Sequence, residues 1–188
     1  VTYSRSLNLG AVLPSVLSTL TNKERVRENL SSLTENPLLT RVAELKAEDM
    51  AEKGYFAHTS PEGKTPWYWF NLVGYKYTYA GENLAVNFSD SERVTEAWMN
   101  SPTHQANLVG RNFTEVGTGV ATGTYKGRES VFVAQVYGKP LVATQLTASV
   151  ASSAWDELLT SPRNALDVFL AVVLALFIVG LLLNLFAK

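Results

Sequence analysis

The two stretches that decide the fold are GYKYTYAGENLA at residues 74–85 and ERVTEAWMNSPTHQANL at residues 92–108. In the first, tyrosines alternate along the chain before Gly81, a pattern that predicts a β-strand. The second overlaps SDSE at residues 89–92, which fits the capping box that opens an α-helix, and its apolar residues then recur at helical spacing. A helix therefore follows the strand, and the Ser-Pro pair at 101–102 ends it and opens a second short helix.

A longer helix is indicated earlier in the chain. Asn36-Pro37 has the form of an N-cap followed by proline at the first helical position, and Gly54 is placed to end the same helix. Apolar residues recur between them at helical spacing, and the charged residues, Lys46 among them, are expected mostly away from that apolar face. We also expect a preceding helix over residues 16–33.

Further signals lie on either side of these elements. A short aromatic helix is expected from Pro66 to Gly74. Residues 116–125 and 130–137 flank the segment KGRE, which predicts a β-hairpin. Helices come first and strands cluster late, so the predicted fold class is α+β, with an antiparallel sheet that carries helices on its faces.

The apolar content is concentrated at the C-terminus. Residues 168–187 (VFLAVVLALFIVGLLLNLFA) contain no charged residue, and about 20 apolar residues at a rise of ~1.5 Å cross a hydrocarbon layer ~30 Å thick. We therefore predict a transmembrane helix within residues 162–188, which makes the membrane a partner of this segment. A tether over 141–161 joins it to the main domain at 17–140, and residues 1–16 form an N-terminal segment.

The composition excludes several classes of protein. The 188 residues carry 16 Lys and Arg against 17 Asp and Glu, a net charge of −1, whereas nucleic-acid-binding proteins normally carry a basic excess. The chain has no Cys, which excludes disulfides, thiolate metal sites and Cys nucleophiles. Because it begins with Val rather than Met, we expect a fragment or a processed form.

Three polar side chains stand out as candidates for a functional site. The chain has two histidines; His58 lies in a turn-rich segment, and His104 would be the third residue of its short helix, where the helix dipole disfavours the imidazolium ion. Glu82 follows the strand pattern in an apolar run, where a carboxylate is seldom left unpaired. Two roles stay open for it: it orients a histidine ring or accepts backbone amides, or it polarises water or completes a metal site.

The motifs, in this order, resemble the bacterial branch of the CAP superfamily (SCP-like, cysteine-rich secretory protein family). The matching segments are FAHTSPEGKTP at 56–66, GYKYTYAGENLA at 74–85, ERVTEAWMNSPTHQANL at 92–108, FTEVGTGVATG at 113–123 and VFVAQVYG at 131–138. The resemblance extends over about residues 17–138. It implies an α–β–α sandwich with a cleft across one face, in a disulfide-free version of the family.

The resemblance also implies which residues form the cleft. The cleft of the family holds two His and two Glu, which bind a divalent metal such as zinc in some members. The two His match His58 and His104, and the Glu of the GEN motif matches Glu82. The second family Glu lies three residues after the helix tryptophan, where this chain has Ser101. We therefore expect a ligand-binding cleft of His58, Glu82, His104 and Ser101, with His58 and His104 as candidate ligands of a divalent metal such as zinc.

Three functions remain open. The favoured one is a non-enzymatic module at the outer face of the membrane that binds a lipid, a glycan or a peptide, because members of the resembled family are mostly secreted or surface proteins. The second is a metal-assisted hydrolase of peptide or cell-wall material, in which Glu82 activates water while His58 and His104 hold the metal. This set is thin beside the three protein ligands usual in catalytic zinc sites. The third is a structural spacer. The aromatic helix is expected to pack in the core, and a ring lining the cleft would favour the binding module.

Overall fold

The computed structural model describes residues 11–141, 170 and 172–179. The elements in chain order are α1 (Pro14–Arg27), β1 (Thr34–Glu35), α2 (Pro37–Lys53), α3 (Pro66–Leu72), β2 (Tyr77–Val86), α4 (Ser91–Met99), α5 (Pro102–Leu108), β3 (Glu115–Tyr125) and β4 (Arg128–Pro140). The chain divides into two compact units, Val1–Leu141 and Val142–Lys188.

The second unit contains the predicted membrane-spanning segment. Residues 170 and 172–179 are helical, and the rest of the predicted span, together with the predicted tether beyond Leu141, lies outside the described residues. None of the helices in the part of the chain that the structure describes combines the length and the apolar character that a membrane crossing requires.

The four strands of the first unit form one mixed sheet in the order β1-β3-β4-β2. β3 and β4 are antiparallel and joined by Lys126-Gly127, whose φ angles of 50° and 75° suit a type I′ hairpin turn. β2 pairs antiparallel with β4 and forms one edge of the sheet. The predicted all-antiparallel sheet is wrong at β1, which runs parallel to β3. β1 has only two residues, too few to show a hydrophobic period in the sequence.

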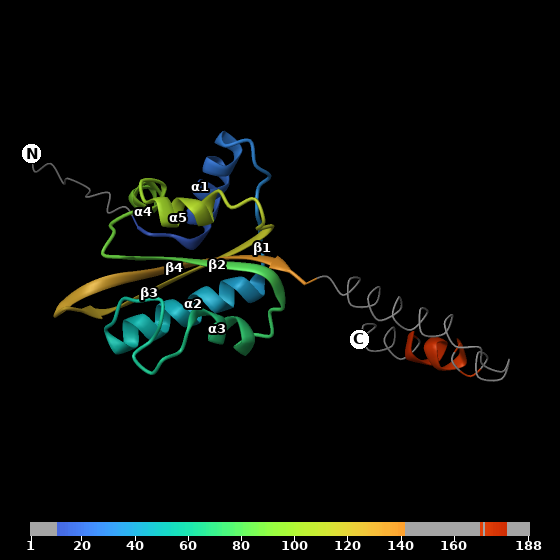
Figure 1. Ribbon diagram of the computed structural model, residues 1–188. Helices are drawn as coiled ribbons and strands as arrows, with labels where there is room; N and C mark the ends of the chain where they lie inside the picture. The colour runs from blue at the N-terminus through green and yellow to red at the C-terminus, as the bar shows by residue number, and fades with distance from the viewer. Residues whose placement is uncertain (1–10, 142–169, 171, 180–188) are drawn as a thin grey trace, which may run out of the picture. The chain divides into compact units, whose positions relative to one another are not determined.

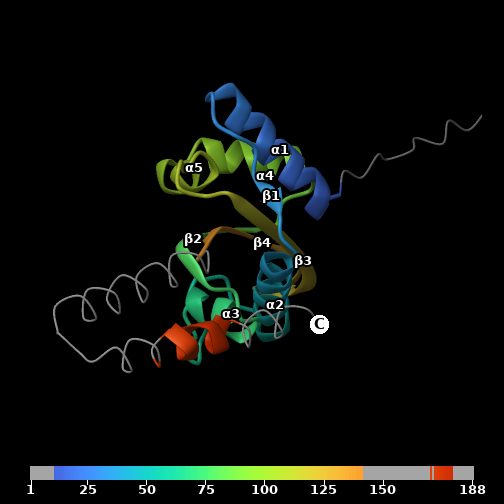
Figure 2. The ribbon, with the colours of Figure 1, turned by 90° about the vertical axis from the view of Figure 1, so that its right-hand side faces the viewer.

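Helices cover both faces of this sheet. α1, α4 and α5 lie on one face and α2 and α3 on the other (Figures 1 and 2), so the predicted α–β–α sandwich is confirmed. A hydrophobic cluster fills each interlayer space: Leu39, Met50 and Phe70 belong to the one beneath α2 and α3, and Leu17 and Trp98 to the other.

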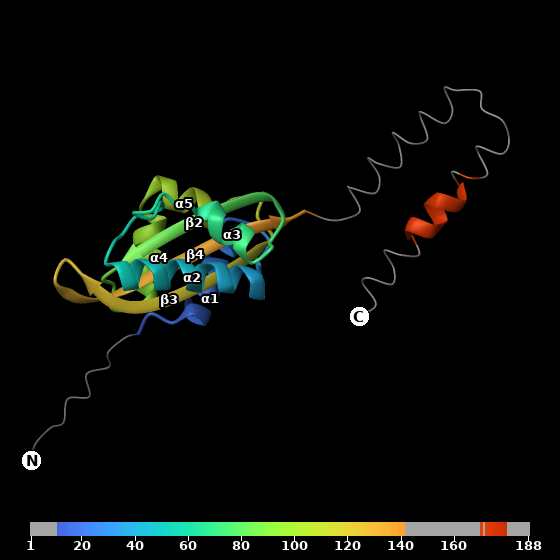
Figure 3. The ribbon, with the colours of Figure 1, turned by 90° about the horizontal axis from the view of Figure 1, so that it is seen from below.

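α2 lies across β3 in the view from below (Figure 3), and its backbone approaches that strand closely. Gly117, Gly119 and Gly123 form a row on the side of β3 that faces α2, since every second residue of a strand points to the same face. A Cβ atom at Gly119 would overlap the backbone of Ala43 and Glu44 in α2. Glycine at these positions therefore lets the helix backbone rest on the sheet.

The ends of α2 are where the local signals predict them. The Asn36 side chain accepts a hydrogen bond from the Leu38 N–H, 2.8 Å away. Gly54 ends the helix in the left-handed conformation, with φ of 67°, which glycine adopts without strain.

Two other helix boundaries differ from the prediction. α1 ends at Arg27 and not at residue 33, because Asn29 takes a left-handed φ of 57° and the N–H groups of Asn29 and Leu30 donate back to the carbonyls of Val26 and Arg25. This arrangement is a Schellman motif with asparagine in the usual place of glycine.

α4 is capped by Asp90 and not by Ser89, the capping residue that the sequence predicted. The Asp90 side chain accepts the Arg93 N–H at 2.8 Å. The Ser89 hydroxyl instead donates to the other carboxylate oxygen of Asp90, also at 2.8 Å.

Candidate functional site

The candidate site is built on β2, the strand at the edge of the sheet. Glu82 lies inside this strand rather than after it. Because successive residues of a strand point to opposite faces, Glu82 lies on the face covered by α2 and α3, like Leu84 of that cluster. Asn83 lies on the face covered by α5, where its side-chain amide donates to the His104 carbonyl at 3.0 Å.

The Glu82 carboxylate holds the ring of His58. Nδ1 of His58 lies 2.6 Å from Oε1 of Glu82, and the two side chains are 55% and 3% exposed. A carboxylate accepts the Nδ1–H of a neutral imidazole, which leaves Nε2 as the nitrogen with the free lone pair. The second carboxylate oxygen, Oε2, is buried and has no hydrogen-bond partner among the described residues. A buried acid thus orients an exposed ring.

His104 is paired with a hydroxyl group instead of a carboxylate. It is the third residue of α5, and its Nδ1 lies 2.7 Å from the Oγ of Ser101, the N-cap residue of the same helix. Burial lowers the pKa of His104, and the charge of His58 lowers it further. The sequence predicted a neutral ring because of the helix dipole, whereas the structure assigns the effect mainly to desolvation. Ser101, where the resembled family has a second glutamate, thus serves as the partner of this ring.

Lys46 also belongs to the site, although the sequence motifs did not predict it. Its side chain is fully buried, and its ammonium group donates to the carbonyls of Ala57 and His58, at 2.7 and 3.0 Å, and to the Tyr55 hydroxyl at 3.0 Å. These three bonds use all three N–H donors of the group. Burial lowers the pKa of Lys46, and the negative charges of Glu82 and Asp49 oppose that effect. Lys46 therefore fixes the backbone that carries His58.

The burial of Lys46 could nevertheless have been predicted from its spacing in the sequence. It lies four residues after Val42 and four before Met50, both fully buried in α2. Residues four apart share one face of a helix, so the spacing places a lysine on the apolar stripe. The prediction that the charged residues of this helix lie away from that stripe is wrong for Lys46.

Asn107 joins α5 to the edge strand. Its side-chain amide donates to the backbone carbonyl of Glu82 at 3.1 Å and to the side-chain oxygen of Asn83 at 2.8 Å. Gly81 leaves room for it, because a Cβ atom there would lie 2.8 Å from Oδ1 of Asn107. The His58 and His104 sides of the site are therefore linked through the backbone of β2.

His58, Glu82 and His104 do not fit a catalytic zinc centre, which usually has three protein ligands. Across residues 11–141 and the described part of the tail, no three His, Cys, Asp or Glu side chains are arranged to hold a metal ion together. Glu82 is engaged with Nδ1 of His58, the arrangement of a carboxylate behind a ligand rather than of a ligand itself. We therefore derive no chemical step through a metal.

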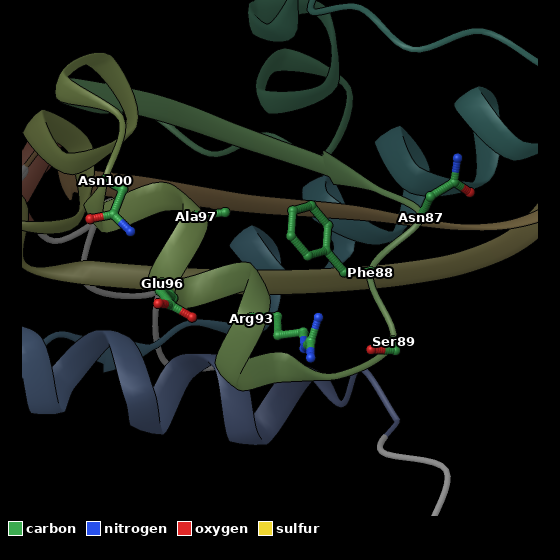
Figure 4. A pocket seen from close by; sticks show the side chains of 7 residues that line it. All are labelled: Asn87, Phe88, Ser89, Arg93, Glu96, Ala97 and Asn100. Atoms are coloured by element: carbon green, nitrogen blue, oxygen red, sulfur yellow. The ribbon is translucent and has the colours of Figure 1, made fainter.

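Two surface pockets lie beside α4 rather than beside His58. One, of about 430 Å³, is formed by α4 and the loop before it (Figure 4). It is lined by Asn87, Phe88, Ser89, Arg93, Glu96, Ala97 and Asn100. The other, of about 410 Å³, lies between α1 and α4. Neither is lined by His58, Glu82 or His104.

The sandwich and the two histidines on either side of a GEN-bearing edge strand define a CAP domain. Residues 19–137 match the sequence model of the family described as "CAP: Cysteine-rich secretory protein family". The chain belongs to this family, which confirms the resemblance seen in its motifs.

Two relatives of the chain are proteins of Bacillus subtilis. The chain is 38% identical over 120 residues to the uncharacterized protein YkwD of Bacillus subtilis (strain 168), covering 64% of this chain and 45% of that protein. It is 34% identical over 101 residues to the uncharacterized membrane protein YlbC of the same organism, covering 54% and 29%. It thus spans less than half the length of these two relatives.

Solved structures share the fold. The crystal structure of an extracellular protein containing a SCP domain from Bacillus anthracis str. Ames superposes with a TM-score of 0.58 at 30% identity. The alignment covers 67% of this chain and 40% of that one. The CAP fold of residues 11–141 is therefore supported by sequence and by structure.

Proposed function

We propose that this chain is a membrane-anchored, extracytoplasmic CAP-domain protein that binds a lipid, a glycan or a peptide without transforming it. The observation that carries the proposal is the pairing of His58 with Glu82, in which a buried carboxylate holds a half-exposed ring. A ring oriented in this way offers one fixed nitrogen to a ligand and needs no reorganisation when the ligand arrives. Ser101 and His104 supply further polar atoms on the α5 side of the same strand.

Binding is favoured over hydrolysis by the surroundings of His104. Ser101 and His104 form the contact expected of a nucleophile and its base. Such a base also needs a group that orients its ring, and among the described residues no carboxylate makes a hydrogen bond to His104; Glu82 is bonded to His58. The pair therefore lacks the third member of a catalytic triad.

The anchored location rests on two supports. Residues 168–187 are apolar and uncharged over the length of a membrane crossing. Among the relatives, the B. anthracis protein is described as extracellular and YlbC is named a membrane protein. We infer that the tail anchors the chain and that the CAP domain lies on the outer side.

The binding proposal is tested with the full chain held in lipid nanodiscs. Retention of purified cell-wall fragments, peptides and short-chain lipids is compared between the wild type and the double variant His58→Ala/His104→Ala. The wild type should retain at least one class of material, and the double variant should lose it. The matched control is Thr59→Ala/Thr103→Ala, which changes two exposed neighbours and should behave as the wild type.

Two results would contradict this proposal. Equal retention by the wild type and the double variant would point to a structural spacer. Cleavage of the retained material by the wild type, with loss of cleavage in the double variant, would point to a hydrolase.

A further inference from the structure

α3 was predicted to pack in the core, but it also exposes an apolar and aromatic surface. Trp69 and Phe70 are buried, but Trp67 and Tyr68 are each 41% exposed and Leu72 is 56% exposed. At about 100° per residue, Trp67, Tyr68, Asn71 and Leu72 fall within about 140° of the helix circumference. We refer to these four residues as the α3 aromatic face.

The chain leaves the CAP domain beside this face. Tyr77 pairs with Pro140 in the sheet, and the Leu141 N–H donates to the Lys76 carbonyl at 3.0 Å. The ring of Tyr77 lies 6.0 Å from the ring of Trp67, centroid to centroid. Leu141, the last described residue of the domain, is itself 38% exposed. The segment that leads to the apolar tail therefore starts next to the α3 aromatic face.

We propose that the α3 aromatic face docks the CAP domain onto the lipid bilayer that holds the tail. This inference rests on the proposed membrane anchor. Trp and Tyr prefer the headgroup level of a bilayer, where one end of the side chain is apolar and the other is wet. Lys64, with its ammonium 4.8 Å from the centroid of the Tyr68 ring, and the exposed Lys76 add positive charge that suits anionic lipids.

A bilayer fits this surface better than a sugar. Stacking on a sugar needs open ring faces, but Tyr68 has Lys64 over its ring and Trp69 against it in a T-shaped contact at 4.9 Å. The Trp67 ring is likewise in contact with Phe70 and Tyr77. Leu72 adds an aliphatic side chain, which inserts between lipids and offers nothing to a sugar hydroxyl.

The absence of Cys makes the test direct, because a single introduced thiol is the only labelling site. Asn71→Cys places an environment-sensitive fluorophore within the face. Lys23→Cys places it at an exposed position of α1, on the opposite face of the sheet. Both full-length variants are reconstituted into vesicles of phosphatidylcholine and phosphatidylglycerol, with or without spin-labelled lipids that quench the fluorophore. Flotation of the vesicles measures anchoring separately.

The expected result is a blue-shifted emission at position 71 that spin-labelled lipids quench, and an unshifted, unquenched emission at position 23. Adding Trp67→Ser and Leu72→Ser to the Asn71→Cys chain should abolish both effects while the chain still floats with the vesicles. Because both residues are exposed, circular dichroism should show an unchanged fold.

Each other outcome overturns a distinct statement. A chain that floats but shows no quenching at position 71 overturns the docking inference and leaves the anchor standing. A chain that does not float overturns both. Quenching at position 71 by labelled cell-wall glycan, or by a second labelled copy of the chain, in place of lipid would assign the face to that partner and overturn docking on the bilayer.

Discussion

At the scale of single residues, the site depends on two buried side chains, Glu82 and Lys46, which contact different parts of His58. Glu82 holds its ring and Lys46 holds its main-chain carbonyl. Removing one partner of a buried polar contact leaves the other without hydrogen bonds, which costs more than the contact itself contributes. The geometry of the exposed His58 ring therefore depends on two buried side chains.

The first prediction concerns Lys46→Met, which keeps the volume of the side chain and removes the ammonium group. The carbonyls of Ala57 and His58 would lose their donor, so the free energy of unfolding should fall by about 2–4 kcal/mol. The measurement is urea unfolding of the detergent-solubilised chain. Lys23→Met, at an exposed lysine of α1, should change stability by no more than ~0.5 kcal/mol. Similar stabilities for the two variants would show that Lys46 does not hold the His58 loop.

The second prediction concerns pH. The pKa of His104 is lowered in the folded chain by burial and by the charge of His58, so the unfolded chain binds the proton more readily. Stability from this group is therefore present above its ordinary pKa of about 6.5 and is lost as the pH falls below that value. The melting temperature should decline from pH 7 to pH 5, and less steeply in His104→Gln.

The cause of that shift can be tested separately by NMR titration. His58→Gln removes the ring whose charge lowers the pKa of His104, so the pKa of His104 should rise relative to the wild type. An unchanged pKa of His104 in this variant would leave burial as the sole cause of the shift. If the melting temperature of His104→Gln declined with pH as steeply as that of the wild type, His104 would not be the cause of the decline.

At the scale of elements, the close approach of α2 to β3 determines where the loop that carries His58 lies. α2 carries Lys46, so its height above the sheet sets the height of the loop that holds His58. The glycine row of β3 is what allows that height. Interiors are close-packed, so an added methyl group must displace the helix rather than fill a void.

The third prediction follows from this packing. Gly119→Ala would drive Cβ into the backbone of α2, and the free energy of unfolding should fall by about 3 kcal/mol. The control is Thr122→Ala, at an exposed position of the same strand. Calorimetric melting of both variants decides the matter: equal melting temperatures would mean that the helix does not rest on the glycine row.

Local signals predicted the elements that have local causes. The caps of α2, the proline start of α3 and the hairpin are all set by a few neighbouring residues. β1 could not be predicted, because a strand of two residues exists only through its partner β3. The end of α1 was missed because Asn29 takes a left-handed conformation usually left to glycine. For the site, the motifs identified His58, Glu82 and His104, while the hydrogen bonds of Lys46 and Asn107 depend on tertiary contacts.

At the scale of the whole CAP domain, each histidine belongs to a different layer of the sandwich. His58 follows α2 on one face of the sheet, and His104 lies in α5 on the other. A single ligand can contact both faces of a sheet at once only at an edge of that sheet. β2, which carries Glu82, is such an edge strand. A ligand that contacts both rings would bridge the two layers and should raise the melting temperature of the domain as it binds.

The position of Asn107 has a further consequence for how copies of this chain meet one another. An edge strand offers unpaired carbonyl and N–H groups on which a strand of another molecule can grow. Asn107 occupies the carbonyl of Glu82 midway along β2. The same side chain that joins α5 to the edge strand therefore also withdraws one backbone acceptor from pairing with a further strand.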